Sequence, residues 1–303
     1  MTSDTDIRTP QVDARRQHRL ERVRKILACP DCGHPLASAG DVPIATCPQC
    51  GRQWQLESRQ FVFEAFSEQE LKADWLNRAK EAAKRRLGKF YPWTIKILSP
   101  VHWAPPVAAF LSRFHLDEEL VADLGSGTSQ YDENVVCVDG ASYPNVHVVC
   151  RLDHLPFGDG TLAGIISIAV LEHVPDPPAH VKEMFRVLRP GGRVLCYIPF
   201  IVGYHASPDD FQRYTKSGMR ELFRDFEIVS LRPGAGPTSG MLWILQEWLA
   251  LVFSFGSQRL YRLLMPLTWI LSPLKYLDVL LIHHPAASVI ASGFLIEARK
   301  PGG

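Results

Sequence analysis

The stretch Val121-Ala-Asp-Leu-Gly-Ser-Gly-Thr-Ser129 decides the fold class of this chain. Its apolar start predicts a short buried strand. Its two glycines predict a tight turn at which a ligand can approach the backbone closely, because glycine has no Cβ. A second apolar run, Val135-Val-Cys-Val138, follows and ends in Asp139. A strand, a glycine turn, a second strand and an acid at its tip are the layout of a nucleoside-binding α/β domain.

Three further motifs follow the glycine turn. They read Leu155-Pro-Phe-Gly-Asp-Gly160, then Ile165-Ile-Ser-Ile-Ala-Val-Leu-Glu-His-Val-Pro-Asp-Pro177, then Phe185-Arg-Val-Leu-Arg-Pro-Gly-Gly-Arg-Val-Leu-Cys-Tyr-Ile-Pro-Phe200. With the glycine turn, and in this order, they make residues 118–235 resemble the class I S-adenosylmethionine-dependent methyltransferases. The resemblance implies an α/β, Rossmann-like fold with a doubly wound sheet of seven strands. The last strand, expected at residues 291–299, is antiparallel in that fold.

The resemblance also implies S-adenosyl-L-methionine as the cofactor. The turn residues Gly125, Ser126 and Gly127 would face its methionine part, because backbone N–H groups bind carboxylates well. Asp139 would accept hydrogen bonds from the two ribose hydroxyls. The remaining expected cofactor residues are Asp123, beside the turn or the ammonium group, and Asp153 and Leu155, beside the adenine.

The chain departs from the family pattern at several positions. Arg151 stands where an acid usually precedes the Leu-Pro-Phe motif, Ala163 replaces a usual acid, and Ser129 replaces a third glycine. The segment 129–134 is too short for the usual first helix, which we expect to be one turn or absent. These departures leave open a degenerate methyltransferase that serves as an interaction module without catalysis.

Residues that could act on a methyl acceptor follow the fifth expected strand. The chain from His205 to Thr215 resembles the H-x-x-P-x-D-[FY]-x-R-[YF]-T stretch of methyltransferases associated with surface glycan synthesis. Thr215 is expected to be the N-cap of a helix at residues 216–223. A histidine there could serve as a base for an oxygen or nitrogen acceptor. The candidate catalytic residues are His205, Asp210, Arg213, Tyr214 and, just past strand four, His173. An Asp210–Arg213 ion pair that only orders the loop, and a purely structural His173, are the competing interpretations.

Two C-x-x-C pairs near the start predict a metal site. Cys29-Pro-Asp-Cys32 and Cys47-Pro-Gln-Cys50 are each followed by a glycine. Four thiolates on two such turns form a closed tetrahedral site for structural Zn²⁺, with no open position for catalysis. Residues 23–64 therefore resemble the zinc ribbons of bacterial and tRNA-modifying methyltransferases, and His34 is expected to be no ligand.

The remaining chain divides into a linker and the catalytic domain. Residues 65–117 are expected to form a helical linker, opened by the capping box Ser67-Glu-Gln-Glu70, and a lid over residues 91–106. The methyltransferase domain is expected at residues 118–303, with a helical insertion at about 236–289 before the last strand.

The insertion is rich in Leu, Trp, Phe and Ile, and it invites a membrane interpretation. Charged residues and prolines interrupt it, so we expect no apolar span of the roughly 18 residues that cross a bilayer. Residues 241–282 could instead contact a membrane peripherally or shelter an apolar acceptor. Packing on the sheet and self-association are the alternatives.

Composition limits the possible partners and location. The 33 basic and 32 acidic residues nearly cancel, which argues against nucleic acid as a partner. The basic run of residues 15–25 is interpreted as a solvated lead-in, with an RNA or anionic-membrane contact as the alternative. No apolar signal-peptide core is present at the start, so the expected location is the cytoplasm or a membrane surface facing it. Cys137, Cys150 and Cys196 are expected to be buried free thiols.

Three functions fit the sequence. The first is an S-adenosylmethionine-dependent methyltransferase that acts on a small-molecule or lipid-linked glycan acceptor. The second is an RNA methyltransferase guided by the zinc ribbon, and the third is the non-catalytic interaction module. The oligomeric state is not indicated by any pattern in the chain.

Overall fold

The computed structural model of the protein describes residues 10–36, 44–56, 60–64, 88, 97–99, 101–102, 105–206 and 209–302. The expected linker helix that starts at Ser67 and most of the expected lid at 91–106 lie outside these residues.

The seven strands of the expected sheet are present and lie in the order β6-β5-β4-β7-β8-β10-β9. Strands β4 to β8 run parallel to one another, and β10 is antiparallel to both β8 and β9. The strands are β4 (Val121–Leu124), β5 (Val136–Asp139), β6 (Val148–Val149), β7 (Leu162–Ile168), β8 (Leu188–Pro199), β9 (Glu227–Ala235) and β10 (Gly293–Arg299). The fold prediction is therefore confirmed for this part of the sheet.

The sheet continues beyond the seven strands, to ten. Three short strands of the cysteine-rich segment extend it at the β6 edge: β1 (Ile44–Thr46), β2 (Gln53–Leu56) and β3 (Phe61–Val62). β3 pairs in parallel with β6, with Phe61 opposite Val148. This addition covers the unpaired backbone groups that an edge strand would otherwise expose. The count of seven was therefore too low, because the ribbon is part of the same sheet.

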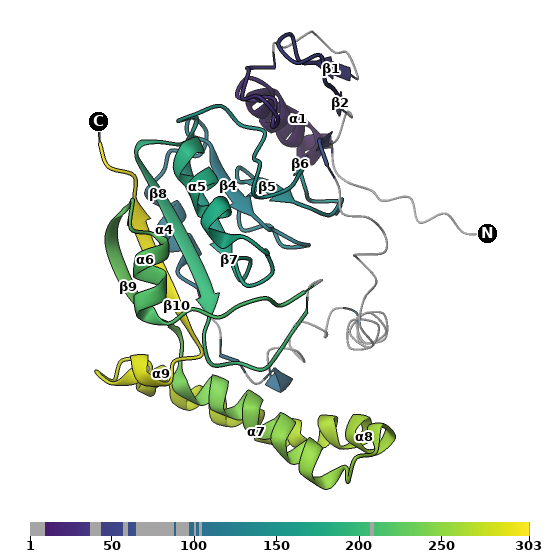
Figure 1. Ribbon diagram of the computed structural model, residues 1–303, viewed down its shortest axis with the longest axis vertical. Coiled ribbons are helices and arrows are strands. Elements are labelled where there is room, and N and C mark those ends of the chain that lie inside the picture. The colour runs from purple at the N-terminus through teal and green to yellow at the C-terminus, as the bar shows by residue number, and fades with distance from the viewer. Residues whose placement is uncertain are drawn as a thin grey trace, which may run out of the picture.

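Helices cover both faces of the sheet (Figure 1). α4 (Val107–Leu111) packs on one face, and α5 (Pro177–Val187) and α6 (Lys216–Leu222) pack on the other. α5 begins where Asp176 accepts a hydrogen bond from the Ala179 N–H, and α6 begins where Thr215 accepts one from the Gly218 N–H. The predicted cap at Thr215 is therefore confirmed. Between β4 and β5, residues 125–135 form turns and no helix, as the short spacing predicted.

The basic lead-in is docked on the domain and is not a solvated segment. It forms α1 (Pro10–Arg24). Arg16 donates to the carbonyls of Pro144 and Val146, and the buried Arg19 contacts the His147 ring at 2.6 Å. Arg22 donates to the Leu116 carbonyl. The helix is amphipathic, but these three arginines are not solvated, because their guanidinium groups contact carbonyls and a histidine of the domain.

The insertion is helical and precedes the last strand, as expected. Figure 1 shows it on the side of the molecule where β8 ends, opposite α1. Its elements are α7 (Pro237–Phe253), α8 (Gln258–Thr268), the 3₁₀ helix η2 (Trp269–Leu277), α9 (Asp278–Leu281) and the short 3₁₀ helix η3 (Ala287–Val289).

The expectation of no bilayer-spanning segment meets one weakly apolar candidate. The helical run Gln258–Leu281 has 24 residues, and an 18-residue window within it has a mean hydropathy of 1.3, which is enough to cross a membrane by length and composition alone. The helix type changes where the prolines lie, since α8 ends two residues after Pro266 and Pro273 lies in the 3₁₀ helix η2. A single such helix is weak grounds for a membrane span.

Candidate functional site

The glycine turn lies directly after β4, at the carboxyl edge of the parallel strands. Gly125 and Gly127 have positive φ angles of 77° and 54°, which other residues rarely adopt. A Cβ on Gly125 would lie 2.4 Å from a methyl group of Val170, whereas a Cβ on Gly127 would meet nothing within 4 Å. The N–H groups of Gly125 and Ser126 donate to the Val138 carbonyl, so β5 holds the turn.

Two carboxyl groups lie beneath this turn. Asp139, at the end of β5, accepts hydrogen bonds from the N–H groups of Gly127 and Ala141, each at 2.8 Å. Burial raises the pKa of Asp139, although these backbone bonds oppose the shift. Asp123 is 2% exposed, and one of its oxygens has no hydrogen-bond partner among the described residues. Burial, and then the charge of Asp139, raise the pKa of Asp123 to about 7.

The three remaining residues of the expected cofactor set differ in what they contact. Arg151 grips Asp153 through two hydrogen bonds of 3.0 and 2.7 Å. Burial raises the pKa of Asp153, but the bonds from Arg151 and His154 outweigh it and lower the pKa to about 2. The Leu155 N–H donates to Glu183 and its carbonyl accepts from Arg186, so both backbone groups are engaged. Ser126 is buried, and its hydroxyl has no partner within the described part of the chain.

The acceptor loop after β8 is held by an ion pair. Asp210, whose side chain is 2% exposed, pairs with Arg213 and accepts from the His205 N–H at 2.8 Å. Burial raises the pKa of Asp210, but Arg213 and the His205 N–H outweigh this and leave it lowered. The ion pair anticipated as the structural alternative is therefore formed, and it fixes the backbone at His205.

Two of the candidate histidines meet at a third side chain. The Nε2 atoms of His173 and His205 each lie 3.7 Å from Oε1 of Glu172, a fully buried residue that directly follows strand β7 and its turn. The two imidazole rings are 5.2 Å apart and nearly perpendicular. Trp243 of α7 packs against the other side of the His205 ring, at 5.4 Å, so the insertion contributes to this site.

Tyr214 does not join this cluster. Its hydroxyl donates to Gln212 at 3.1 Å, and its ring packs against the core beneath α6. Burial, and then the charge of Asp176, raise its pKa.

Sequence reasoning missed some residues of the site. Glu172 was not among them, since Glu172 and His173 were expected to face the same opening as the loop of His205, and the structure brings all three together. Asn145 donates to the carbonyls of Gly127 and Ser129 and so anchors the glycine turn. Tyr131 lies near Asp123, since burial and then the Asp123 charge raise the tyrosine pKa to about 12.

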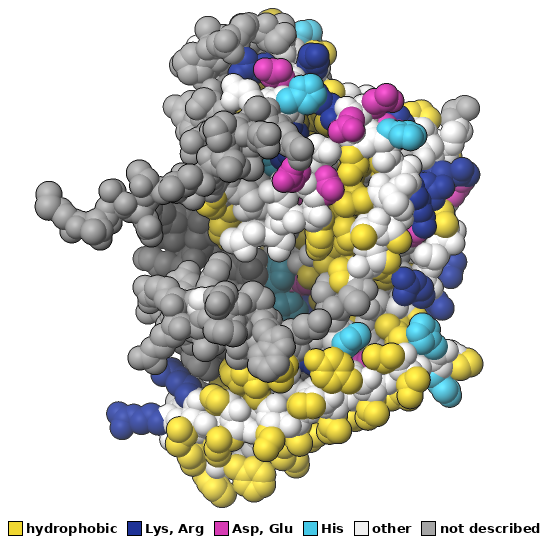
Figure 2. Space-filling model, turned by 180° about the vertical axis from the view of Figure 1, so that it is seen from behind, with side chains coloured by type: hydrophobic (Ala, Val, Ile, Leu, Met, Phe, Trp, Pro, Cys, Tyr) yellow, Lys and Arg dark blue, Asp and Glu magenta, His cyan; other side chains and the backbone are white. Residues whose placement is uncertain are grey.

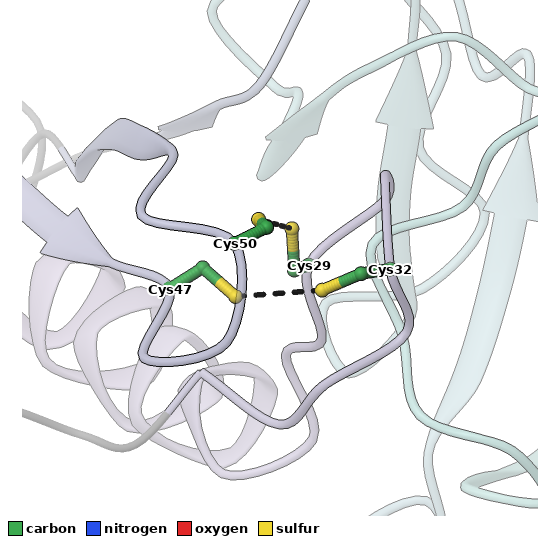
Figure 3. A group of neighbouring side chains, drawn as sticks. All are labelled: Cys29, Cys32, Cys47 and Cys50. Carbon is green, nitrogen blue, oxygen red and sulfur yellow. Dashed lines mark hydrogen bonds between the residues drawn. The ribbon is translucent and has the colours of Figure 1, made fainter.

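The four clustered cysteines converge as the spacing predicted (Figure 3). The Sγ atoms of Cys29 and Cys50 are 3.7 Å apart, and those of Cys32 and Cys47 are 3.5 Å apart. All four sulfurs lie within 4.8 Å of one another. Gly33 and Gly51, with φ angles of 72° and 71°, donate their N–H groups back to Cys29 and Cys47 and close the two turns. Cys137, Cys150 and Cys196 are buried free thiols, as expected.

Comparisons with known proteins agree with the fold and the motifs. The family described as Methyltransferase domain matches residues 123–196. A probable S-adenosylmethionine-dependent methyltransferase of Mycolicibacterium smegmatis is 37% identical over 84 residues, which are 27% of this chain and 33% of that protein. A probable tRNA methyltransferase 9B of Mus musculus is 33% identical over 139 residues, which are 40% of this chain and 31% of that protein.

A solved structure is similar at lower identity. Phosphoethanolamine N-methyltransferase 2 of Haemonchus contortus, in complex with S-adenosyl-L-methionine, is 15% identical with a TM-score of 0.44, over 79% of this chain and 60% of that chain. This chain spans only about a third of the length of the two curated relatives. The matched segment includes the glycine turn, Asp139 and the Leu-Glu-His-Val motif. Residues 123–196 of this chain therefore form a methyltransferase domain of the S-adenosylmethionine-dependent family.

Proposed function

We propose that this protein transfers a methyl group from S-adenosyl-L-methionine to an acceptor bound beside the loop 203–214. One observation supports the proposal above the others: the glycine turn and Asp139 meet at the carboxyl edge of β4 and β5, within the matched methyltransferase segment. Ligands of open α/β sheets bind at this edge. A methyl group on a sulfonium is already activated, so the protein mainly has to align the acceptor and exclude water.

In this proposal Asp139 grips the ribose and Asp123 faces the cationic part of the cofactor. Each Asp139 oxygen accepts one backbone hydrogen bond and has a second lone pair for a ribose hydroxyl. The N–H groups of Gly125, Ser126 and Gly127 already have partners, so the methionine carboxylate has to use other donors or replace these bonds. Because Arg151 already donates two hydrogen bonds to the Asp153 carboxylate, adenine would be recognised by shape complementarity and not by this acid.

Calorimetric titration with S-adenosyl-L-methionine tests the proposal. We expect Asp139→Ala to weaken binding at least tenfold, because charge-assisted hydrogen bonds contribute about 1.5–3 kcal/mol each. Asp225→Ala, an exposed acid next to α6, is the matched control and should bind like the wild type. A wild type that does not bind, or an Asp139→Ala variant that binds equally well, would support the non-catalytic module instead.

For the acceptor we propose a small molecule or a lipid-linked glycan, presented at a membrane surface. The support lies in the exposed face of the insertion. Figure 2 shows hydrophobic side chains gathered along the edge of the molecule where the insertion lies. Large apolar side chains exposed by half or more include Trp248, Leu251, Leu263, Leu267, Ile270, Leu277 and Leu280. A patch of this kind marks an interaction surface.

The polar groups of the insertion point inward. Asp278, 1% exposed, accepts from the N–H groups of Thr238 and Ser239 at the start of α7. Lys275, also 1% exposed, donates to the carbonyls of Ile97 and Ser99. The exposed charges of α7 to α9 are Arg259 and Arg262, whereas Glu247 is half-buried and accepts from Tyr261. An apolar face with a basic end suits an anionic lipid surface.

Sedimentation with phosphatidylcholine vesicles, with and without phosphatidylglycerol, tests the membrane contact. We expect the protein to bind, and to bind better when the anionic lipid is present. The triple variant Leu263→Gln, Ile270→Gln, Leu280→Gln should lose binding at least tenfold, while Val229→Gln, on β9, should bind normally. Equal binding of the triple variant, or a wild type that self-associates without binding vesicles, would contradict the proposal.

We further propose that the four cysteines hold a structural Zn²⁺. Ligands about 2.3 Å from a tetrahedral zinc lie roughly 3.8 Å apart, close to the sulfur separations of 3.5 and 3.7 Å. With all four positions filled by thiolates, the ion would hold the ribbon together and leave catalysis to the sheet edge. Zinc analysis of the Cys47→Ser, Cys50→Ser double variant should show about one equivalent less than the wild type, and an unchanged content would contradict this.

A tRNA acceptor is the second candidate, favoured by the relatives named probable tRNA methyltransferase 9B. The contacts of α1 weigh against it, because Arg16, Arg19 and Arg22 satisfy carbonyls and a histidine of the domain itself. Filter retention of tRNA at physiological salt decides: salt-sensitive submicromolar binding would favour RNA over a lipid-linked acceptor.

A further inference from the structure

Three side chains with free electron pairs converge at the acceptor side of the sheet. Glu172, His173 and His205 each offer one ligand atom, and these atoms lie within 4.8 Å of one another. Glu172 is fully buried, and neither of its carboxylate oxygens has a hydrogen-bond partner among the residues that the structure describes. Leaving a buried carboxylate without a partner costs several kcal/mol unless a cation compensates its charge.

The hydrogen bonds of the two histidines fix which nitrogen faces Glu172. Nδ1 of His173 lies 2.6 Å from the Asp209 carbonyl, which can only accept, so Nδ1 carries the hydrogen. Nδ1 of His205 lies 3.2 Å from the Gly203 carbonyl, a shorter contact than the 3.4 Å to Arg213. In both rings Nε2 is then left with a lone pair that is directed toward the carboxylate.

We infer that Glu172, His173 and His205 form a binding site for a divalent transition-metal ion. Two imidazoles and one carboxylate are a common ligand set for zinc and iron, and histidine ligands usually donate their second N–H to a carbonyl or carboxylate, as here. The 3.7 Å separations between Glu172 and the two Nε2 atoms are too long for hydrogen bonds. They are close to the separation of tetrahedral ligands about 2.0–2.2 Å from one ion, which lie roughly 3.3–3.6 Å apart.

The site differs in kind from the four-cysteine cluster. Three protein ligands leave at least one position open, which is the arrangement of ions that bind substrate. The site lies where the acceptor loop, the turn after β7 and Trp243 of the insertion meet. The ion would therefore bind and orient an acceptor through an oxygen, such as a hydroxyl or carboxylate. This last step rests on the proposed methyltransferase function, whereas metal binding itself does not.

Zinc content of the full chain provides the test. The protein is loaded with Zn²⁺, freed of excess metal by gel filtration, and analysed by mass spectrometry. Glu172→Gln keeps the shape of the side chain but removes its charge, and His205→Gln removes a ligand from a half-buried position. We expect each variant to hold about one equivalent of zinc less than the wild type. Asp209→Asn, an exposed acid beside the site whose side chain is no ligand, should retain the wild-type content.

Cofactor titration of the same proteins separates this inference from the function on which it builds. Glu172→Gln should bind S-adenosyl-L-methionine like the wild type, which also shows that the variant is folded. Equal zinc content in Glu172→Gln and wild type overturns the metal site, whatever the cofactor titration gives. The wild type could instead fail to bind the cofactor and still hold about one equivalent of zinc more than Glu172→Gln. That result would refute the methyltransferase proposal and support the metal site.

Discussion

The proposed cofactor side and the proposed acceptor side of this sheet are built in different ways. The cofactor side consists of one short stretch, residues 123–127, whose backbone is held by its neighbour strand and by Asp139. The acceptor side is assembled from side chains of three separate segments: the turn after β7, the loop after β8 and α7. Each contains a buried carboxylate, Asp123 or Glu172, with an oxygen that has no hydrogen-bond partner among the described residues. Within the described part of the chain, Glu172 has two imidazoles beside it and Asp123 has none.

This difference tells which changes each side tolerates. A backbone turn depends on glycine and on the fit of one neighbouring residue, so small substitutions disturb it locally. A site made of side chains from distant segments depends on the loop that positions them. In this protein that loop is held by the Asp210–Arg213 ion pair, which therefore has more influence on the acceptor side than any single candidate catalyst.

The largest effect is expected for Arg213→Met. It leaves the Asp210 carboxylate, 2% exposed, without its cation, and removing one partner of a buried pair costs about 3–5 kcal/mol. Arg224→Met is the matched control. It breaks the Arg224–Glu221 pair at the same spacing, but both side chains are at least 70% exposed, so urea unfolding should detect little change. Similar losses for the two variants would show that the loop does not depend on its buried pair.

Asp123→Asn should change how stability depends on pH. The carboxyl group has a pKa of about 7 when folded and 3.8 ordinarily, so the native state binds the proton more tightly than the unfolded chain. The wild type therefore loses stability as pH rises from 4 to 7, and the asparagine variant lacks this loss. The difference in unfolding free energy between the variant and the wild type should therefore shift in favour of the variant by at most about 4 kcal/mol between pH 4 and pH 8. Parallel pH curves from chemical denaturation would show that Asp123 is ionised in the native state.

The two glycines of the turn should respond differently to alanine. Gly125→Ala places a Cβ 2.4 Å from Val170 and forces a φ of 77°, so we expect a loss of about 3 kcal/mol in unfolding free energy. The Cβ added by Gly127→Ala would meet no atom within 4 Å. Only the unfavourable φ angle then remains, and it should lower the unfolding free energy by about 1 kcal/mol. Thermal unfolding of both variants ranks them. An equal effect would mean that Val170 moves aside easily.

The sequence predicted features that are encoded within a short segment, and it missed contacts between distant segments. The glycine turn, the Thr215 cap and the paired cysteines are each encoded within a few residues, and local spacing was enough to find them. The doubly wound sheet of seven strands with an antiparallel last strand followed from the resemblance. The fold also led us to expect Glu172 and His205 at one opening, but not their approach to 3.7 Å, because the two residues come from different loops.

Two larger errors have the same origin. The expected sheet of seven strands did not include the ribbon, but β3 pairs with β6 and so covers an edge that would otherwise be exposed. The arginines of α1 were interpreted as solvated, since a basic run without a visible partner is usually on the surface. Arg16, for example, donates to the carbonyls of Pro144 and Val146, more than a hundred positions away, and backbone carbonyls leave no mark in a sequence.

The smallest effect is expected for Tyr214→Phe, which tests whether Tyr214 belongs to the acceptor site. Its hydroxyl contacts Gln212, whose amide donates to the Val174 carbonyl, and its ring packs under α6. Phenylalanine keeps the ring and removes one partly exposed hydrogen bond, so unfolding free energy should change by less than about 1 kcal/mol. Zinc content and cofactor affinity should be unchanged, in contrast to the one-equivalent loss expected for His205→Gln. A zinc deficit in Tyr214→Phe would instead place the phenol among the groups that form the acceptor site.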